Sequence, residues 1–193
     1  MYTCAHCTVL ACGEEYPEKL PKNCPMQKAG LMNTVLETYS LPENRTFYIT
    51  ASELEALGYC QWPRIKETIL LCQKMGYTKI GLAFCRGLRK EAKIVDELLR
   101  RAGLEVVSVI CKTGGIDKER VGIAPDSKVN PGRFEPMCNP IAQAMLLNEQ
   151  QTQFNIALGL CVGHDSMFYK YSDALVTTLV AKDRVTGHNP AAA

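Results

Sequence analysis

Ten cysteines are the residues of this 193-residue chain best suited to do chemistry, and they fall into groups. Cys4, Cys7, Cys12 and Cys24 lie within a stretch of 21 residues. Two residues between a pair of cysteines let the chain turn back and present both sulfurs to one metal, and two further thiolates complete a tetrahedral site. The spacing therefore predicts a metal site, occupied either by structural zinc or by a four-cysteine iron–sulfur cluster.

The segment that carries this set, residues 1–26, contains three prolines and almost no periodic apolar pattern. Such a segment cannot bury a core by itself, so a bound metal would supply its order. We predict a cysteine-rich metal-binding segment at 1–26 and a separate domain at 27–193. Four unrelated surface thiols are the alternative interpretation.

A second group of cysteines is marked by its position. Cys85, Cys111 and Cys161 each directly follow an apolar run of strand length. If these runs are parallel neighbours, their ends meet at the carboxyl edge of one sheet, where open α/β folds bind their ligands. Cys138 directly precedes a predicted helix start and belongs to the group if its loop lies at the same edge. We predict that these four cysteines form a second pocket for a metal, an iron–sulfur cluster or another ligand.

Basic residues adjoin the predicted pocket. Four cations are candidates for binding an anion: Arg86, Lys112, Lys182 and Arg184. Nearby cations and a helix N-terminus both favour a thiolate over a thiol. A glycine-flanked turn would expose Cys161 in front of a helix, close to His164, so these two residues are the candidates for catalysis. Two cysteines lie outside both groups: Cys72, on an apolar helical stripe, is predicted to be core, and Cys60 is unassigned.

The elements that must position these cysteines follow from the apolar pattern. Runs of strand length predict four strands, at residues 80–84, 104–110, 154–160 and 175–181. Helices are predicted at residues 27–39, 63–75, 88–102, 140–149 and 166–171. A strand, an amphipathic helix and a strand within about 30 residues form a right-handed βαβ unit with parallel strands. We predict a doubly wound α/β domain with a mostly parallel sheet, of the Rossmann-like or flavodoxin-like type.

Two other segments carry separate expectations. Residues 46–50 are β-branched and aromatic, which predicts a short strand followed by a helix from Ser52. Residues 112–137 are rich in glycine and proline and show no periodicity. Loops of this length in a compact domain are usually functional, and this loop joins Cys111 to Cys138, so we expect it to cover the same edge of the sheet.

Composition limits the classes of partner. Lys plus Arg is 22 and Asp plus Glu is 20, a net charge of +2, which argues against a dedicated nucleic-acid binder. Neither a signal peptide nor an apolar run of about 20 residues is present, so we expect a cytoplasmic protein without a membrane partner. Thiols stay reduced there, and cysteine clusters more often mean metal or redox chemistry than disulfides.

At these residues the sequence resembles a family of uncharacterised proteins that are predicted to bind metal and are known only as a domain of unknown function. Besides the N-terminal cysteines, the resemblance rests on residues 80–88 with Glu91 and Ala92, 107–114, 138–140, 159–168, 182–185 and 188–190. It covers nearly the whole chain. It implies metal binding and assigns no reaction.

Three hypotheses follow. In the first, the chain is a metal-binding α/β protein with a four-cysteine N-terminal site and a second, redox-active or cluster-binding pocket. In the second, Cys161 is the nucleophile of a thiol enzyme that acts on a small anionic molecule or exchanges with a redox partner. In the third, the chain is a binding module with structural zinc and no chemistry of its own. The residues leave open whether the protein is an enzyme.

Overall fold

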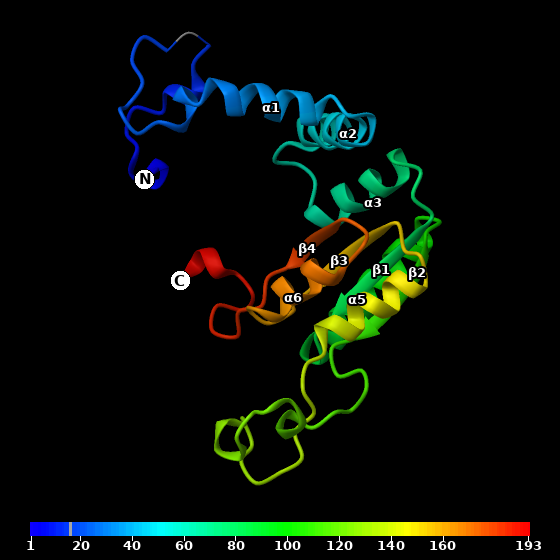
Figure 1. The fold of residues 1–193 in the computed structure, drawn as a ribbon. Coiled ribbons are helices and arrows are strands. Elements are labelled where there is room, and N and C mark those ends of the chain that lie inside the picture. The colour runs from blue at the N-terminus through cyan, green and yellow to red at the C-terminus, as the bar shows by residue number, and fades with distance from the viewer. Residues whose placement is uncertain (16) are drawn as a thin grey trace. The chain divides into compact units, whose positions relative to one another are not determined.

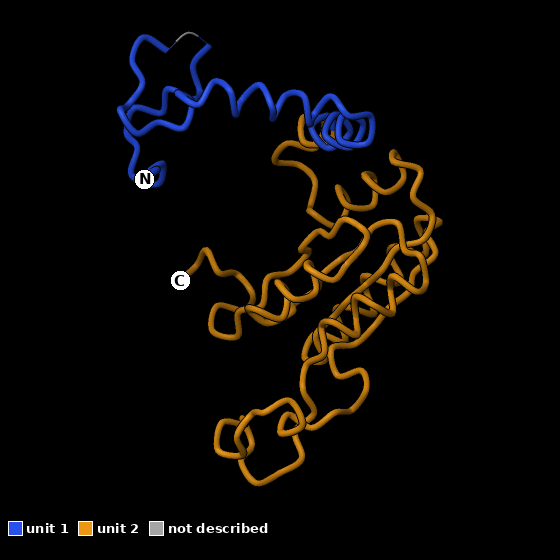
Figure 2. Tube along the Cα trace, in the orientation of Figure 1, with its two compact units in different colours: residues 1–53 blue, residues 54–193 orange. Residues whose placement is uncertain are grey.

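The computed structural model describes residues 1–15 and 17–193 (Figure 1), which form two compact units, residues 1–53 and 54–193 (Figure 2). The boundary between the units lies within helix α2. The domain boundary expected at residue 26 stays a prediction. The first unit contains only helical elements in its described residues: 3-10 helices η1 (Cys4–His6), η2 (Ala11–Gly13) and η3 (Pro25–Gln27), then α1 (Ala29–Tyr39) and most of α2 (Pro42–Gly58).

The second unit alternates strands and helices. Its main elements are α3 (Arg64–Lys74), β1 (Lys79–Phe84), α4 (Arg89–Arg101), β2 (Glu105–Ile110), α5 (Pro140–Glu149), β3 (Phe154–Leu158), α6 (His164–Tyr171) and β4 (Val176–Val180). Short 3-10 helices lie between them: η4 (Arg86–Leu88), η5 (Lys118–Val121), η6 (Pro125–Ser127) and η7 (Pro190–Ala192). No helix in the described part of the chain is long and apolar enough to cross a membrane.

The four strands form one sheet in the order β2-β1-β3-β4, and each pairing is parallel. The chain moves outward from β1 to β2, then returns past β1 to β3 and β4. This reversal is the switch point of a doubly wound fold, and the order agrees with the flavodoxin-like type. The predicted fold class is confirmed, and the pairing within this sheet is parallel throughout.

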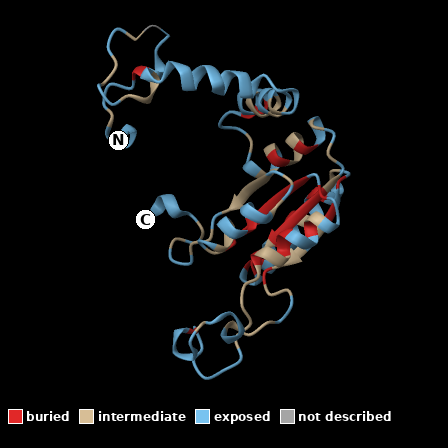
Figure 3. Cartoon of the chain, in the orientation of Figure 1, coloured by how far each residue is buried: buried red, intermediate tan, exposed pale blue. Residues whose placement is uncertain are grey.

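Helices cover both faces of the sheet. Leu82 faces α4, next to Ala92, whereas Ala83 packs in one cluster with Ala144 and Leu147 of α5. Successive residues of a strand point to opposite faces, so α4 and α5 lie on opposite sides of the sheet. Burial is concentrated in the central strands and on the inner sides of these helices (Figure 3).

Two sequence predictions need correction. Residues 46–50 are not a strand but part of α2, and Ser52 lies inside that helix rather than at its start. Pro42 begins the helix and strong helix formers follow at residues 53–57, which outweighs the weak β preference of a short run that has no strand to pair with. β3 ends at Leu158, so Cys161 follows it after a two-residue turn instead of directly.

A buried amide fixes how closely β1 and β3 approach. Asn155 of β3 is fully buried, and its side chain bonds Thr152 and Ser172, at 2.8 Å each. Opposite it, β1 has Gly81, where a Cβ atom would clash with Asn155 Oδ1 and lie 2.8 Å from Leu147 Cδ1. Glycine at this position therefore lets the polar network fit beside the strand.

Gly81→Ala is expected to lower the free energy of unfolding by about 1–3 kcal/mol, because the Asn155 amide cannot move without breaking its hydrogen bonds. Chemical denaturation measures the change. The control is Gly30→Ala in α1, which adds the same methyl group where nothing lies within 4 Å. Equal stability of the two variants would contradict this account.

Candidate functional site

The N-terminal cysteines lie on a series of tight turns. Cys4 begins η1, and the N–H of Cys7 closes that turn on the Cys4 carbonyl at 3.0 Å. Cys12 lies in η2, and Cys24 is the residue before η3. The side chain of Asn23 bonds that of Thr3, so the residues preceding Cys24 and Cys4 are tied together. Four cysteines separated in sequence are thereby brought to one place.

These four cysteines line one small cavity of about 90 Å³, together with apolar residues such as Leu10, Ala11 and Met26. Ala11 is the one buried residue among the described positions 1–15 and 17–27. The segment thus has almost no apolar core, and its thiols surround the space where a core would be. A donor set of four free thiols suits zinc or iron.

The side chains of these four cysteines do not have the geometry of metal ligands in this structure. Within residues 1–15 and 17–193, no group of three or more His, Cys, Asp or Glu side chains is arranged to hold a metal ion. Metal binding would therefore require rotation of cysteine side chains that already line the cavity.

The strand-end cysteines lie at the carboxyl edge of the sheet, as the sequence predicts. The N–H of Cys85 bonds the last carbonyl of β3 at 3.0 Å, and the N–H of Cys111 bonds the last carbonyl of β1 at 2.9 Å. Cys138 joins them because the N–H of the next residue, Asn139, bonds the Cys111 carbonyl at 2.7 Å. Cys85 and Cys111 are buried, with 8% and 2% exposed, and Cys138 is half-buried.

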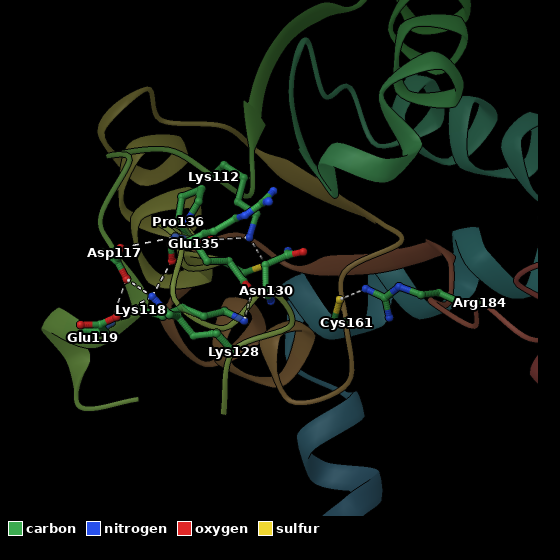
Figure 4. A network of polar contacts seen from close by, with 12 residues as sticks. Lys112, Asp117, Lys118, Glu119, Lys128, Asn130, Glu135, Pro136, Cys161 and Arg184 are labelled. Atoms are coloured by element: carbon green, nitrogen blue, oxygen red, sulfur yellow. Dashed lines mark hydrogen bonds and ion pairs between the residues drawn. The ribbon is translucent and has the colours of Figure 1, made fainter. Parts of the chain in front are cut away.

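Three of these thiols lie together. Cys85 and Cys111 belong to one buried cluster, and Cys138 packs against it. Cys161 contacts a cation instead: its sulfur accepts from Arg184 Nη2 at 3.3 Å (Figure 4). We call Cys85, Cys111 and Cys138 the thiol trio. The predicted four-cysteine pocket thus consists of a trio and a separate fourth thiol.

Each of the four sulfurs accepts a hydrogen bond from nitrogen. Cys111 accepts from the N–H of Arg86 at 3.3 Å, and Cys138 accepts from Lys112 Nζ at 3.4 Å. Cys85 accepts from the N–H of Gly87 and from Lys182. Three of the four predicted cations, Lys112, Lys182 and Arg184, therefore bond sulfur, whereas Arg86 contributes its backbone N–H.

These contacts shift the titration of the trio. The hydrogen bond from Cys111 lowers the pKa of Cys85 to about 5, with help from Gly87 and Lys182 and against the effect of burial. The same donor, followed by Lys112, lowers the pKa of Cys138 to about 5. The pKa of Cys111 is raised by its thiol neighbours Cys138 and Cys85 and by burial. Because Cys111 has one proton to donate, it can bond only one of these neighbours at a time.

The turn after β4 presents two of the cations. The Asp183 carboxylate accepts hydrogen bonds from the backbone N–H groups two and three residues later. His188 closes the turn: its N–H bonds the Asp183 carbonyl at 2.7 Å, and its Nδ1 accepts from the Asp183 N–H at 3.1 Å. Lys182 and Arg184 are held on either side of Asp183, one at Cys85 and the other at Cys161.

No hydrogen bond joins the Cys161 and His164 side chains. The N–H of His164 bonds the Cys161 carbonyl at 2.9 Å, and the His164 side chain contributes to the lowered pKa of Cys138. Arg184 is the partner of the Cys161 thiol. Cys72 is fully buried, as expected for core, and burial raises its pKa to about 12. Cys60 is exposed and belongs to neither site.

Sequence reasoning missed two contributors to the strand-end site. One is the backbone of Arg86 and Gly87, whose N–H groups point at two sulfurs. The other is Gln143 of α5, which is fully buried and donates to the carbonyls of Phe84 and Val109, at 3.3 and 2.7 Å. Backbone donors leave no sequence signal, and a glutamine in a helix becomes informative only when its burial is known.

The loop between Cys111 and Cys138 is tied down by ion pairs. Lys128, whose side chain is 2% exposed, pairs with Glu119 and Asp117 and donates to a backbone carbonyl. Lys118 pairs with Glu135 (Figure 4). At the base of the loop, the Lys112 Nζ atom donates both to the Pro136 carbonyl and to Cys138. The loop is therefore ordered by charge, and Lys112 couples it to the trio.

Lys128→Met should leave two carboxylates without their cation and loosen the loop. We expect faster amide hydrogen exchange across residues 112–137, with little change in the sheet. Arg120→Met is the matched control, because Arg120 is an exposed cation of the same loop. Unchanged exchange in Lys128→Met would show that the ion pairs do not order the loop.

Acid should loosen the loop as well. Hydrogen bonds from Glu119 N–H and Lys118 lower the pKa values of Asp117 and Glu135, respectively. A carboxyl group whose pKa is lower in the folded than in the unfolded protein stabilises the fold at pH values above its unfolded pKa, about 4. This stabilisation is lost as the pH falls through the folded-state pKa. Exchange within 112–137, corrected for its intrinsic pH dependence, should therefore rise below about pH 4 before exchange in the sheet does. If the loop and the sheet lost their protection from exchange at the same pH, this account would be contradicted.

Comparison with known proteins places the chain in a family without assigning a function. No solved structure gives a significant match. The uncharacterized protein MJ0455 of Methanocaldococcus jannaschii is 45% identical over 172 residues, which is 89% of this chain and 86% of that protein. Residues 24–179, which include the strand-end cysteines, match a family described as "Protein of unknown function (DUF1847)". The chain therefore belongs to this family of proteins of unknown function.

Proposed function

We propose that this protein is a metal-binding α/β protein whose N-terminal segment folds around a thiolate-bound metal. Cys4, Cys7, Cys12 and Cys24 are the ligands, and the metal is a zinc ion or an iron–sulfur cluster. The observation that carries the proposal is the convergence of these four thiols on one cavity, in a segment that buries one residue among its described positions.

Energetics support a structural role for the metal. A segment without an apolar core gains too little from burial to offset the entropy of ordering its backbone. Binding of zinc by four thiolates contributes on the order of 10 kcal/mol in small zinc domains, which is enough to order such a segment. A reducing compartment such as the cytoplasm would keep the ten cysteines available as thiolates.

A second candidate function is thiol chemistry at Cys161. The observation in its favour is that Cys161 is half-exposed and bonds a cation, whereas the trio is packed together. In this alternative Cys161 attacks a small anionic substrate held by Arg184 and Lys182. It predicts rapid alkylation of Cys161 near neutral pH, and slow labelling would argue against it.

Cys7→Ser and Cys12→Ser should each lose the metal of the N-terminal site, because three thiolates and a hydroxyl bind zinc and iron more weakly than four thiolates. Elemental analysis and visible absorption of anaerobically purified protein measure the loss and separate zinc from iron.

The control is Cys60→Ser, which removes an exposed cysteine outside both sites and should keep the wild-type metal content. Limited proteolysis adds a second readout, since the segment before α1 should become sensitive when the metal is lost. Wild-type metal content and protease resistance in both variants would overturn the proposal.

A further inference from the structure

We propose that the thiol trio at the carboxyl edge of the sheet is a second metal centre, with three protein ligands and a fourth coordination position for an anion. The ligands are Cys85, Cys111 and Cys138, and the metal is a thiophilic one, either a zinc ion or an iron–sulfur cluster. Cys161 is not a ligand. This centre is separate from the N-terminal site and does not depend on it.

The first support is the convergence of the three sulfurs. They come from the end of β1, the end of β2 and the start of α5, and they pack in one cluster. As at the N-terminal site, the side chains would have to rotate to become metal ligands. Three protein ligands with one open position is the usual arrangement of catalytic rather than structural zinc sites. Cys161 differs because its contact is with Arg184.

The second support is the set of hydrogen-bond donors around the sulfurs. Cys111 has the Arg86 N–H, Cys85 has the Gly87 N–H and Lys182, and Cys138 has Lys112. Donors of this kind orient metal-bound thiolates and tune the metal. Cysteines that merely fill a core have no need of a nitrogen donor on each sulfur.

The third support is charge. Three thiolates and a divalent metal, or a cluster core of charge +2, carry a net charge of −1. Lys112 and Lys182 bring +2 to Cys138 and Cys85. The site would therefore keep an excess of positive charge, which favours an anion as the fourth ligand.

The fourth support is an unsatisfied buried group. Gln143 holds the ends of β1 and β2 through its Nε2, yet its Oε1 is buried with no hydrogen-bond partner among the described residues. Leaving such an oxygen unpaired costs roughly 1–3 kcal/mol. Only a bound ligand that carries a proton, such as hydroxide or hydrosulfide, would supply the donor that this oxygen lacks.

Burial weighs against the main competing interpretation, a dithiol that exchanges with disulfide partners. Cys85 and Cys111 are 8% and 2% exposed, so a bulky disulfide could reach this cluster only through the half-buried Cys138. A metal ion is smaller than a disulfide substrate. A dithiol that exchanges with a disulfide uses two sulfurs, whereas the proposed metal centre uses all three.

The test compares metal content among single serine variants of the full chain, each purified anaerobically and also reloaded with zinc alone or with iron and sulfide. Cys85→Ser, Cys111→Ser and Cys138→Ser should each lose one metal centre and keep the N-terminal one. Cys161→Ser should keep both centres, although it removes a cysteine from the same edge. Cys72→Ala, a buried cysteine that is not a ligand, controls for damage to the core.

A separate measurement tests the fourth coordination position of the strand-end centre. In cobalt(II)-loaded Cys7→Ser protein, which retains only the strand-end centre, added azide should shift the visible absorption bands. Full metal content in all three trio variants, or loss of a centre in Cys161→Ser, would overturn the proposal. So would protein that binds no metal at this edge and in which Cys111 and Cys138 form a disulfide with each other while oxidised glutathione is reduced to two molecules of glutathione. Circular dichroism of each variant excludes unfolding as the cause of metal loss.

Discussion

The parallel pairing of β1 between β2 and β3 is the constraint on which the strand-end site depends. Parallel strands end at the same edge of the sheet. Cysteines from three stretches that are far apart in the sequence are therefore brought close together in the fold. Asn155 and Gly81 set the spacing of the two central strands, and Gln143 bonds the carbonyls near the ends of β1 and β2. The sheet is in this sense the scaffold that holds Cys85 and Cys111.

The groups around each sulfur then determine how readily the cysteines at this edge lose their protons. Burial alone favours a neutral thiol, as at Cys72, whose pKa burial raises to about 12. At the edge, the neighbouring Cys111 thiol, followed by nearby nitrogen donors and lysines, lowers the pKa values of Cys85 and Cys138 instead. The two environments lie in one domain and contain the same residue type. Neighbouring residues therefore separate the titration of a packing cysteine from that of a strand-end cysteine, and several of these neighbours belong to the loop at 112–137 and the turn at 182–188.

Much of this arrangement was accessible from the sequence. Apolar runs located all four strands, and the positions of Cys85 and Cys111 after two of them predicted a shared edge, since strand direction follows from βαβ connectivity. The helix over residues 46–50 was missed because β-branched residues tolerate a helix when the flanking residues favour it. The sequence also did not predict that Cys161 is separate from the thiol trio, because this depends on a two-residue turn after β3 and on the contact with Arg184. Backbone donors such as the Gly87 N–H have no sequence signature.

The two cysteine sites differ in what surrounds them, so the metals that we propose for them would have different roles. The N-terminal thiols line a cavity in a segment with almost no buried residue, whereas the trio is embedded in a packed sheet edge with an excess of cations. X-ray absorption at the zinc edge of zinc-loaded Cys7→Ser protein tests the strand-end centre most directly. We predict three sulfur ligands at about 2.3 Å and one lighter ligand. A shell of four sulfurs, or of nitrogen and oxygen alone, would contradict this account.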